Sequence, residues 1–227
     1  MPTLLAENTV QLQFSDLLTR VPIRRPSLPP ARAVGAHQSE ILAYIARKVG
    51  WLKPGEKEEE EYPLLWALGC AWEEWAASLY AGMEWQPGEV TVDGISGNAD
   101  GLSDDPVYGA VVEEFKLTYK SAVSGAEFLT DKRYRMWQHQ GRAYLKGYLG
   151  ADQEGGSGSG SGEGSGGGGV VRWHVCHVRN DYHEFGPVYK QYVVWFSAKE
   201  VRETWAMLTR FREEAMAEKE GMEVIEF

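Results

Sequence analysis

The hydrophobic spacing of this chain changes from a helical period to strict alternation and back, which restricts the fold class more than any other feature. Apolar residues recur every three or four positions, which predicts helices, in residues 38–49, 63–82 and 131–149. Alternation with a period of two, interrupted by turn residues, predicts strands in residues 89–95, 97–102, 110–118, 170–178 and 188–196. Ser197 and Glu200 form a capping box for a last helix to about residue 220. The order αβββαβ predicts an α/β fold, with a central mixed β-sheet flanked by helices.

The chain divides into an N-terminal arm and a single domain. Residues 1–36 are rich in Pro and Arg between positions 20 and 32, which predicts an extended arm. The arm contains Arg24, Arg25 and Arg32. These arginines either contact DNA or only keep a linker soluble. Residues 37–227 suffice for one domain, in which His37, Gln38 and Ser39 either cap a helix or line the path of a ligand. Residues 155–169 contain ten Gly, four Ser and one Glu, which predicts a flexible loop, natural or engineered.

Charge and cysteine content exclude several classes of protein. With 23 Lys and Arg against 33 Asp and Glu, the net charge of −10 argues against indiscriminate adhesion to nucleic acid or to anionic membranes. Two cysteines, Cys70 and Cys176, are too few for a disulfide scaffold, a four-cysteine zinc site or an iron–sulfur cluster within this chain. No apolar stretch has the length of a membrane helix, and the first residues do not resemble a signal peptide. We therefore expect a cytoplasmic protein with no membrane partner.

The predicted strand 110–118 carries charged side chains on both of its faces. Alternation places Glu114 and Lys116 on one face and Glu113 and Phe115 on the other. Asp100 stands near the end of the preceding strand, and the turn between the two strands brings its carboxylate towards Glu114. Two converging carboxylates suit Mg²⁺ or Mn²⁺, which prefer oxygen ligands. The alternative interpretation is a plain salt bridge on an exposed strand.

The predicted helix 131–149 combines a polar pair with a basic face. Gln140 and Tyr144 are four residues apart and therefore share one side of the helix, where the glutamine amide needs a hydrogen-bonding partner. Five basic residues against the single acidic Asp131 predict the course of a DNA phosphate backbone, and they are Lys132, Arg133, Arg135, Arg142 and Lys146. A solvated basic face is the alternative.

These motifs together resemble those of a known superfamily. Asp100 followed by Glu114-Phe115-Lys116 resembles the D…(D/E)-x-K motif of PD-(D/E)XK nucleases. The segment from Gln140 to Tyr144 resembles the Q-x-x-x-Y motif of the RecB-like branch. Gly69 to Glu73 resembles the G-x-x-x-E segment of phage recombination exonucleases such as lambda exonuclease. The resemblance covers roughly residues 63–196, and its motifs follow the order of the superfamily core.

The resemblance implies a restriction-endonuclease-like core and a magnesium-dependent deoxyribonuclease. It implies an exonuclease of phage-type recombination, repair or replication, in the cytoplasm of a bacterium or of a phage-infected host cell. Metal ligands would be Glu73, Asp100, Glu114 and the backbone carbonyl of Phe115, while Lys116, Gln140 and Tyr144 would act on the attacking water or the substrate. The partner would be DNA. A homo-oligomer or a phage recombination partner is not specified by these residues, and neither are the cutting polarity or a preference for RNA or branched DNA.

The rival interpretation is a non-catalytic DNA-binding or assembly module that retains the nuclease fold. Two sets of residues also stay outside the nuclease assignment. His174, Cys176, His177 and His183 suggest zinc, but alternation puts His177 on the opposite face from His174 and Cys176, so no zinc site is expected. Glu113 has no assigned role beyond pairing with an Arg or Lys.

Overall fold

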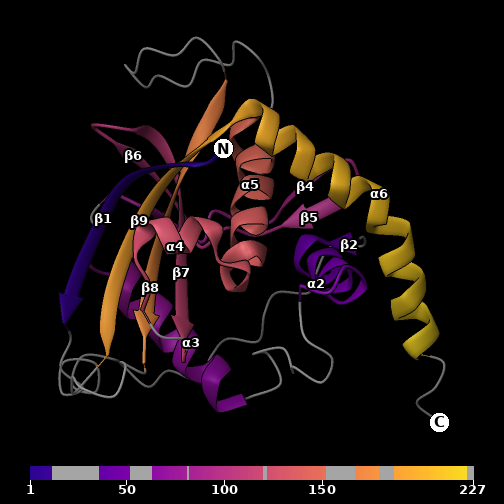
Figure 1. Cartoon of the computed structure of the whole chain (residues 1–227), viewed down its shortest axis with the longest axis horizontal. Coiled ribbons are helices and arrows are strands. Elements are labelled where there is room, and N and C mark those ends of the chain that lie inside the picture. The colour runs from indigo at the N-terminus through magenta and orange to yellow at the C-terminus, as the bar shows by residue number, and fades with distance from the viewer. Residues whose placement is uncertain are drawn as a thin grey trace.

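The computed structural model describes residues 1–11, 36–51, 63–80, 82–119, 122–151, 167–178 and 187–223. Its main layer is a six-stranded sheet with the strand order β1-β9-β8-β7-β6-β3 (Figure 1). The strands are β1 (Thr3–Gln11), β3 (Glu84–Trp85), β6 (Gly101–Asp105), β7 (Gly109–Thr118), β8 (Gly168–His177) and β9 (Val188–Ser197). Strands β7 and β8 are parallel, and the other neighbours are antiparallel. This confirms an α/β fold with a mixed central sheet.

Helices cover both faces of this sheet. The helices are α2 (Gln38–Lys48), α3 (Pro63–Ala77), α4 (Gly125–Thr130), α5 (Arg135–Leu149) and α6 (Ala198–Glu223), with a 3-10 turn, η2 (Lys132–Tyr134). On one face Tyr144 and Leu145 of α5 pack against Val112 and Trp173. On the other face Trp72 of α3 shares a buried cluster with Phe115 and Cys176. Figure 1 shows α5 between the sheet on one side and α2 and α6 on the other.

The predicted run of three strands in one sheet is wrong in its first part. Residues 89–95 are interrupted by a two-residue turn at Asp93 and Gly94, whose φ angles are 51° and 73°. Positive φ at both positions is typical of tight hairpin turns, for which Asp-Gly is a favoured pair. The hairpin joins β4 (Val90–Val92) to β5 (Ile95–Gly97), and β2 (Ala36–His37) completes a separate three-stranded sheet.

The prediction of an extended N-terminal arm over residues 1–36 is also partly wrong. Residues 3–11 form β1, which pairs antiparallel with β9, and alternate residues such as Leu4 and Ala6 are half-buried. Glu7 anchors the strand, because its carboxylate accepts the backbone N–H of Gly125 at 2.7 Å and lies 2.6 Å from the ammonium of Lys190. The Pro- and Arg-rich stretch with Arg24, Arg25 and Arg32 lies outside the described residues.

The glycine-rich segment has a strand at its end. Residues 152–166 lie outside the described part of the chain, but Gly168 and Gly169, predicted as loop, begin β8 and pair with Ser197 and Phe196. A side chain at Gly168 would collide with the carbonyl oxygen of Phe196, so only glycine fits this pairing. Among the helices that the structure describes, none is long and apolar enough to cross a membrane.

Candidate functional site

Strand β7 presents an ion pair of a buried carboxylate and a half-buried ammonium to the face of the sheet that α5 covers. Glu114 is fully buried, and the ammonium nitrogen of Lys116 lies 2.7 Å from its Oε2 atom. No described residue donates a hydrogen bond to Oε1 of Glu114. A buried carboxylate with an unpartnered oxygen is costly, so this position is unusual for a structural side chain.

Asp100 lies beside this pair, as the sequence predicts. Gly101 pairs with Glu113, and continuation of this antiparallel register places the preceding residue, Asp100, opposite Glu114. The Asp100 Oδ2 atom accepts the backbone N–H of Phe115 at 2.7 Å and lies 3.7 Å from the Lys116 ammonium. Lys116 therefore stands between two carboxylates that come from adjacent strands.

Glu73 reaches the same group from α3. It is half-buried, whereas its neighbour Glu74 is exposed. Burial and the negative charge of Asp100 raise the pKa of Glu73 well above its usual value, and Lys116 offsets this only in part. Because this effect requires proximity, the carboxylate of Glu73 belongs to the cluster formed by Glu73, Asp100, Glu114 and Lys116, which we call the acidic cluster.

The charged groups of the acidic cluster shift one another's pKa values. Burial and the charge of Asp100 raise the pKa of Glu114 to about 8. Burial alone would lower the pKa of Lys116, but Glu114 and Asp100 raise it well above its ordinary value. Three carboxyl groups thus adjoin one ammonium, and the raised pKa values of Glu73 and Glu114 reflect burial and the repulsion among their negative charges. A bound divalent cation would relieve that repulsion.

Helix α5 adds the predicted polar pair to this face. The Gln140 amide donates to the Tyr144 hydroxyl at 3.0 Å. Tyr144 is buried, and burial together with the charge of Glu114 raises its pKa well above the ordinary value. Its hydroxyl is therefore protonated at neutral pH and adjoins the acidic cluster, while Gln140 acts on the cluster through Tyr144.

Gln38 is a further polar residue at this site, with its Nε2 atom unpartnered among the described residues. It begins α2, is buried, and borders a small pocket together with Ser96, Tyr144 and Trp205. His37 caps the helix, because its ring nitrogen accepts the backbone N–H of Ser39. The sequence gives only a weak signal for Gln38 as a site residue, because most glutamines at the start of a helix lie at the surface.

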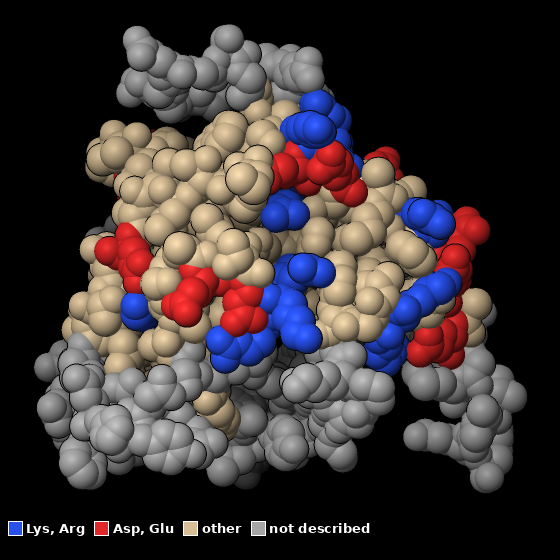
Figure 2. Space-filling model, viewed as in Figure 1, with Lys and Arg blue, Asp and Glu red and all other residues tan. Residues whose placement is uncertain are grey.

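The predicted basic face is mixed in character. Lys132, Arg133 and Arg135 are exposed, but Arg133 pairs with Asp131 at 2.6 Å. Lys146 is half-buried. Figure 2 shows Lys and Arg side chains next to Asp and Glu rather than in one continuous basic patch.

Arg142 is engaged inside the protein. Its guanidinium lies 4.7 Å from the ring centre of Phe196 and 3.5 Å from the hydroxyl of Thr204 on α6. Its contact with DNA stays a prediction.

The residues that suggest zinc are used differently. Nε2 of His174 lies 2.8 Å from Glu113 and Nδ1 lies 2.8 Å from the hydroxyl of Tyr189, so both ring nitrogens have partners. Cys176 is buried in the apolar cluster with Trp72, and His183 lies outside the described residues. In the described part of the chain, no group of three or more His, Cys, Asp or Glu side chains is arranged to hold a metal ion.

Comparisons with known proteins identify no family. The sequence matches no model of a known protein family and no curated protein. The crystal structure of SSO0001 aligns with 82% of this chain and 78% of its own at 14% sequence identity, with a TM-score of 0.42. A likeness this loose carries no argument about function.

Proposed function

We propose that this chain is a metal-dependent nuclease that hydrolyses DNA phosphodiester bonds, with the acidic cluster as its catalytic centre. The observation that carries the proposal is the buried Glu114–Lys116 pair beside Asp100. Ionised groups in a protein interior cost more free energy than apolar side chains of similar volume. Strongly shifted pKa values at groups so placed are typical of functional sites.

The side chains of the cluster supply oxygen ligands of the kind that a divalent cation prefers, although the described residues are not arranged as a ready metal-binding group. Glu73, Asp100 and Glu114 would hold it, with the carbonyl of Phe115 as a further ligand, and Oε1 of Glu114 has no competing hydrogen-bond donor among the described residues. Carboxylate and carbonyl oxygens suit Mg²⁺ or Mn²⁺. When bound, such an ion polarises a phosphate and lowers the pKa of a coordinated water.

The remaining residues of the site would orient the reactants. Lys116 keeps its charge at neutral pH because the carboxylates raise its pKa. Its ammonium would hold the attacking water and balance the charge that develops on the phosphate. Tyr144, oriented by Gln140, keeps its proton and would donate it in a hydrogen bond to a phosphate oxygen.

DNA would lie along the exposed basic residues near the start of α5. Lys132 and Arg135 are available at the surface, and they neutralise phosphates in a protein whose net charge is −10. The choice of an exonuclease of phage-type recombination, repair or replication rests on the resemblance of the sequence motifs.

A non-catalytic DNA-binding or assembly module is the second candidate. It is favoured by the absence, within the described residues, of a ready metal-binding group and by the position of the Lys116 ammonium between the carboxylates. In this interpretation Lys116 takes the place of a cation permanently.

Digestion of end-labelled linear and circular DNA with Mg²⁺ tests the proposal. The wild type is expected to cut, and Asp100→Ala and Lys116→Ala are not. Asp104→Ala is the matched control, because Asp104 is an exposed aspartate on β6, the strand that Asp100 directly precedes. Equal cutting by all four proteins would contradict the assignment of the site. No cutting by the wild type, and no binding of Mn²⁺ in calorimetry, would favour the non-catalytic module.

A further inference from the structure

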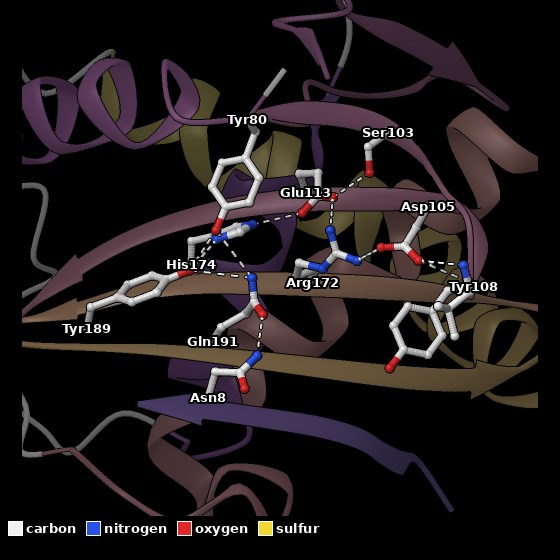
Figure 3. Close-up of polar contacts among 11 residues, drawn as sticks. Asn8, Tyr80, Ser103, Asp105, Tyr108, Glu113, Arg172, His174, Tyr189 and Gln191 are labelled. Atoms are coloured by element: carbon white, nitrogen blue, oxygen red, sulfur yellow. Dashed lines mark hydrogen bonds and ion pairs between the residues drawn. The ribbon is translucent and has the colours of Figure 1, made fainter. Parts of the chain in front are cut away.

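A buried hydrogen-bonded network lies on the opposite face of β7 from the acidic cluster (Figure 3). At its centre Glu113 is only 1% exposed. Its Oε1 atom accepts from the Ser103 hydroxyl at 2.5 Å and from the Arg172 guanidinium at 2.9 Å. Its Oε2 atom lies 2.8 Å from Nε2 of His174. Both oxygens of this carboxylate are thus occupied, and the pairing with an arginine confirms the one role predicted for Glu113.

The network continues from Glu113 in two directions. Beyond His174 it passes through the hydroxyls of Tyr189 and Tyr80, which are 2.9 Å apart, and through Gln191 to Asn8 on β1. On the other side Arg172 forms an ion pair with Asp105 at the far end of β6. Apart from Tyr80, these side chains come from five neighbouring strands of the sheet, β6, β7, β8, β9 and β1, and their contacts can be followed in Figure 3.

Glu113 occupies a special place in the register of the sheet. It pairs with Gly101 on β6 and with Arg172 on β8, so it joins β7 to both neighbouring strands. Gly101 directly follows Asp100, and Glu113 directly precedes Glu114. The donors to Glu113 therefore link β7 to both of its neighbouring strands, next to the backbone positions of Asp100 and Glu114.

Stability alone does not account for this arrangement. A buried carboxylate and guanidinium pay a desolvation cost, and apolar residues of similar size often stabilise a fold equally well. Hydrogen bonds are directional, so a fully satisfied polar network also fixes the relative positions of the strands that it joins. Outer groups that orient metal ligands typically change metal affinity or activity by about 10-fold to 100-fold when removed.

We infer that Glu113 is a positioning residue that holds Asp100 and Glu114 at the separation needed to bind a divalent cation. This inference rests on the proposed function, because it concerns the same site. The hydrogen bond from Phe115 N–H to Asp100 forms only while β6 and β7 keep their register. Ser103 supplies the link from β6, and Arg172 and His174 supply those from β8.

Three variants test this inference. Glu113→Gln retains the volume but cannot accept from all three donors, and Ser103→Ala removes only the link to β6. Asp105→Asn is the control, because it removes a charge from the same network at the far end of β6. We expect Glu113→Gln to weaken Mn²⁺ binding in calorimetry by about tenfold or more and to lower kcat with little change in KM for DNA. Asp105→Asn is expected to lower Tm while Mn²⁺ affinity stays at the wild-type level.

The outcomes separate the two proposals. If the wild type binds Mn²⁺ and Glu113→Gln binds it equally well, Glu113 does not position the site, although the proposed function stands. If Glu113→Gln does not fold, as judged by near-ultraviolet circular dichroism, the affinity of Ser103→Ala decides in the same way. If the wild type binds no Mn²⁺ and cuts no DNA, the proposed function fails and this inference fails with it.

Discussion

Glu113 and Glu114 are consecutive residues whose carboxylates are both buried, on opposite faces of strand β7. Glu113 accepts hydrogen bonds at both of its oxygens, whereas Oε1 of Glu114 has no hydrogen-bond partner among the described residues and its Oε2 lies 2.7 Å from the ammonium of Lys116. Two adjacent carboxylates therefore differ in what they can still bind. The satisfied one stabilises the sheet, and the unsatisfied one is available to a ligand.

Removal of the Lys116 charge should destabilise the fold. Above the Glu114 pKa of about 8, Lys116→Met leaves that carboxyl group buried without a charged partner, so we expect the free energy of unfolding at pH 9 to fall by about 3–5 kcal/mol. The double variant Glu114→Gln/Lys116→Met removes both charges and should recover most of that loss. Urea unfolding of the three proteins measures this. A double variant as unstable as Lys116→Met would show that packing, rather than charge, keeps Lys116 in place.

The two neighbouring glutamates of α3 should differ in their effect on activity. Glu73 adjoins Asp100 and Glu114, while Glu74 is exposed. Glu73→Gln is expected to raise the Mg²⁺ concentration needed for half-maximal cutting by about tenfold or more, because it removes a proposed ligand. Glu74→Gln should match the wild type in the same titration. A larger effect at Glu74 would mean that the face of α3 that carries Glu74, rather than the face that carries Glu73, lies at the site.

Folding stability should decrease at acidic pH because of His139. Its ring stacks on Trp51 with 5.0 Å between centroids, and burial together with the charges of Arg142 and Arg135 lowers its pKa to about 3. Between that value and about 6.5, the ordinary pKa, the unfolded chain binds a proton that the folded protein excludes. Stability therefore falls as pH decreases through this range, with a slope of at most about 1.4 kcal/mol per pH unit from this group.

His139→Phe keeps an aromatic ring against Trp51 and cannot titrate. Chemical unfolding at several pH values between 4 and 7 should therefore give a flatter profile for this variant than for the wild type. Identical slopes in the two proteins would assign the acid sensitivity to other groups.

Two glycines within helices should respond oppositely to alanine. A Cβ atom at Gly141 of α5 would lie 2.7 Å from the Trp173 ring, so Gly141→Ala should cost about 1–3 kcal/mol by overpacking. At Gly69 of α3 no described atom lies within 4 Å, so Gly69→Ala should stabilise by about 0.5–1 kcal/mol through helix propensity. Thermal unfolding compares the two. A gain at Gly141 would mean that Trp173 has room to move.

The parts of the fold that could be predicted are those that depend on local pattern. Alternation predicts β7 and β9, and the turn between β6 and β7 suffices to bring Asp100 to Glu114 because both strands are contiguous in the chain. Local pattern does not state which distant strand will be a neighbour. For that reason the sequence predicts an arm where β1 lies, and it predicts one strand of the main sheet over residues 89–95, where the structure has a hairpin of a separate sheet.

The role of Glu113 illustrates the same limit at the level of a side chain. Its three donors come from Ser103 on β6 and from Arg172 and His174 on β8. Strand β8 is parallel to β7 and begins some fifty residues after it in the chain. Sequence spacing contains no information about that pairing, so a charged partner could be expected without being named.

The order of strands in the main sheet also sets an order for its assembly. Among the described strands, β1 comes first along the chain, yet its neighbour β9 comes last. The hairpin of β6 and β7, which brings Asp100 and Glu114 together, can pair as soon as it emerges. During synthesis Asp100 and Glu114 can therefore come together before the main sheet is complete. Strand β1 remains without its neighbour until β9 has been made, and that interval is when β1 is most exposed to mispairing.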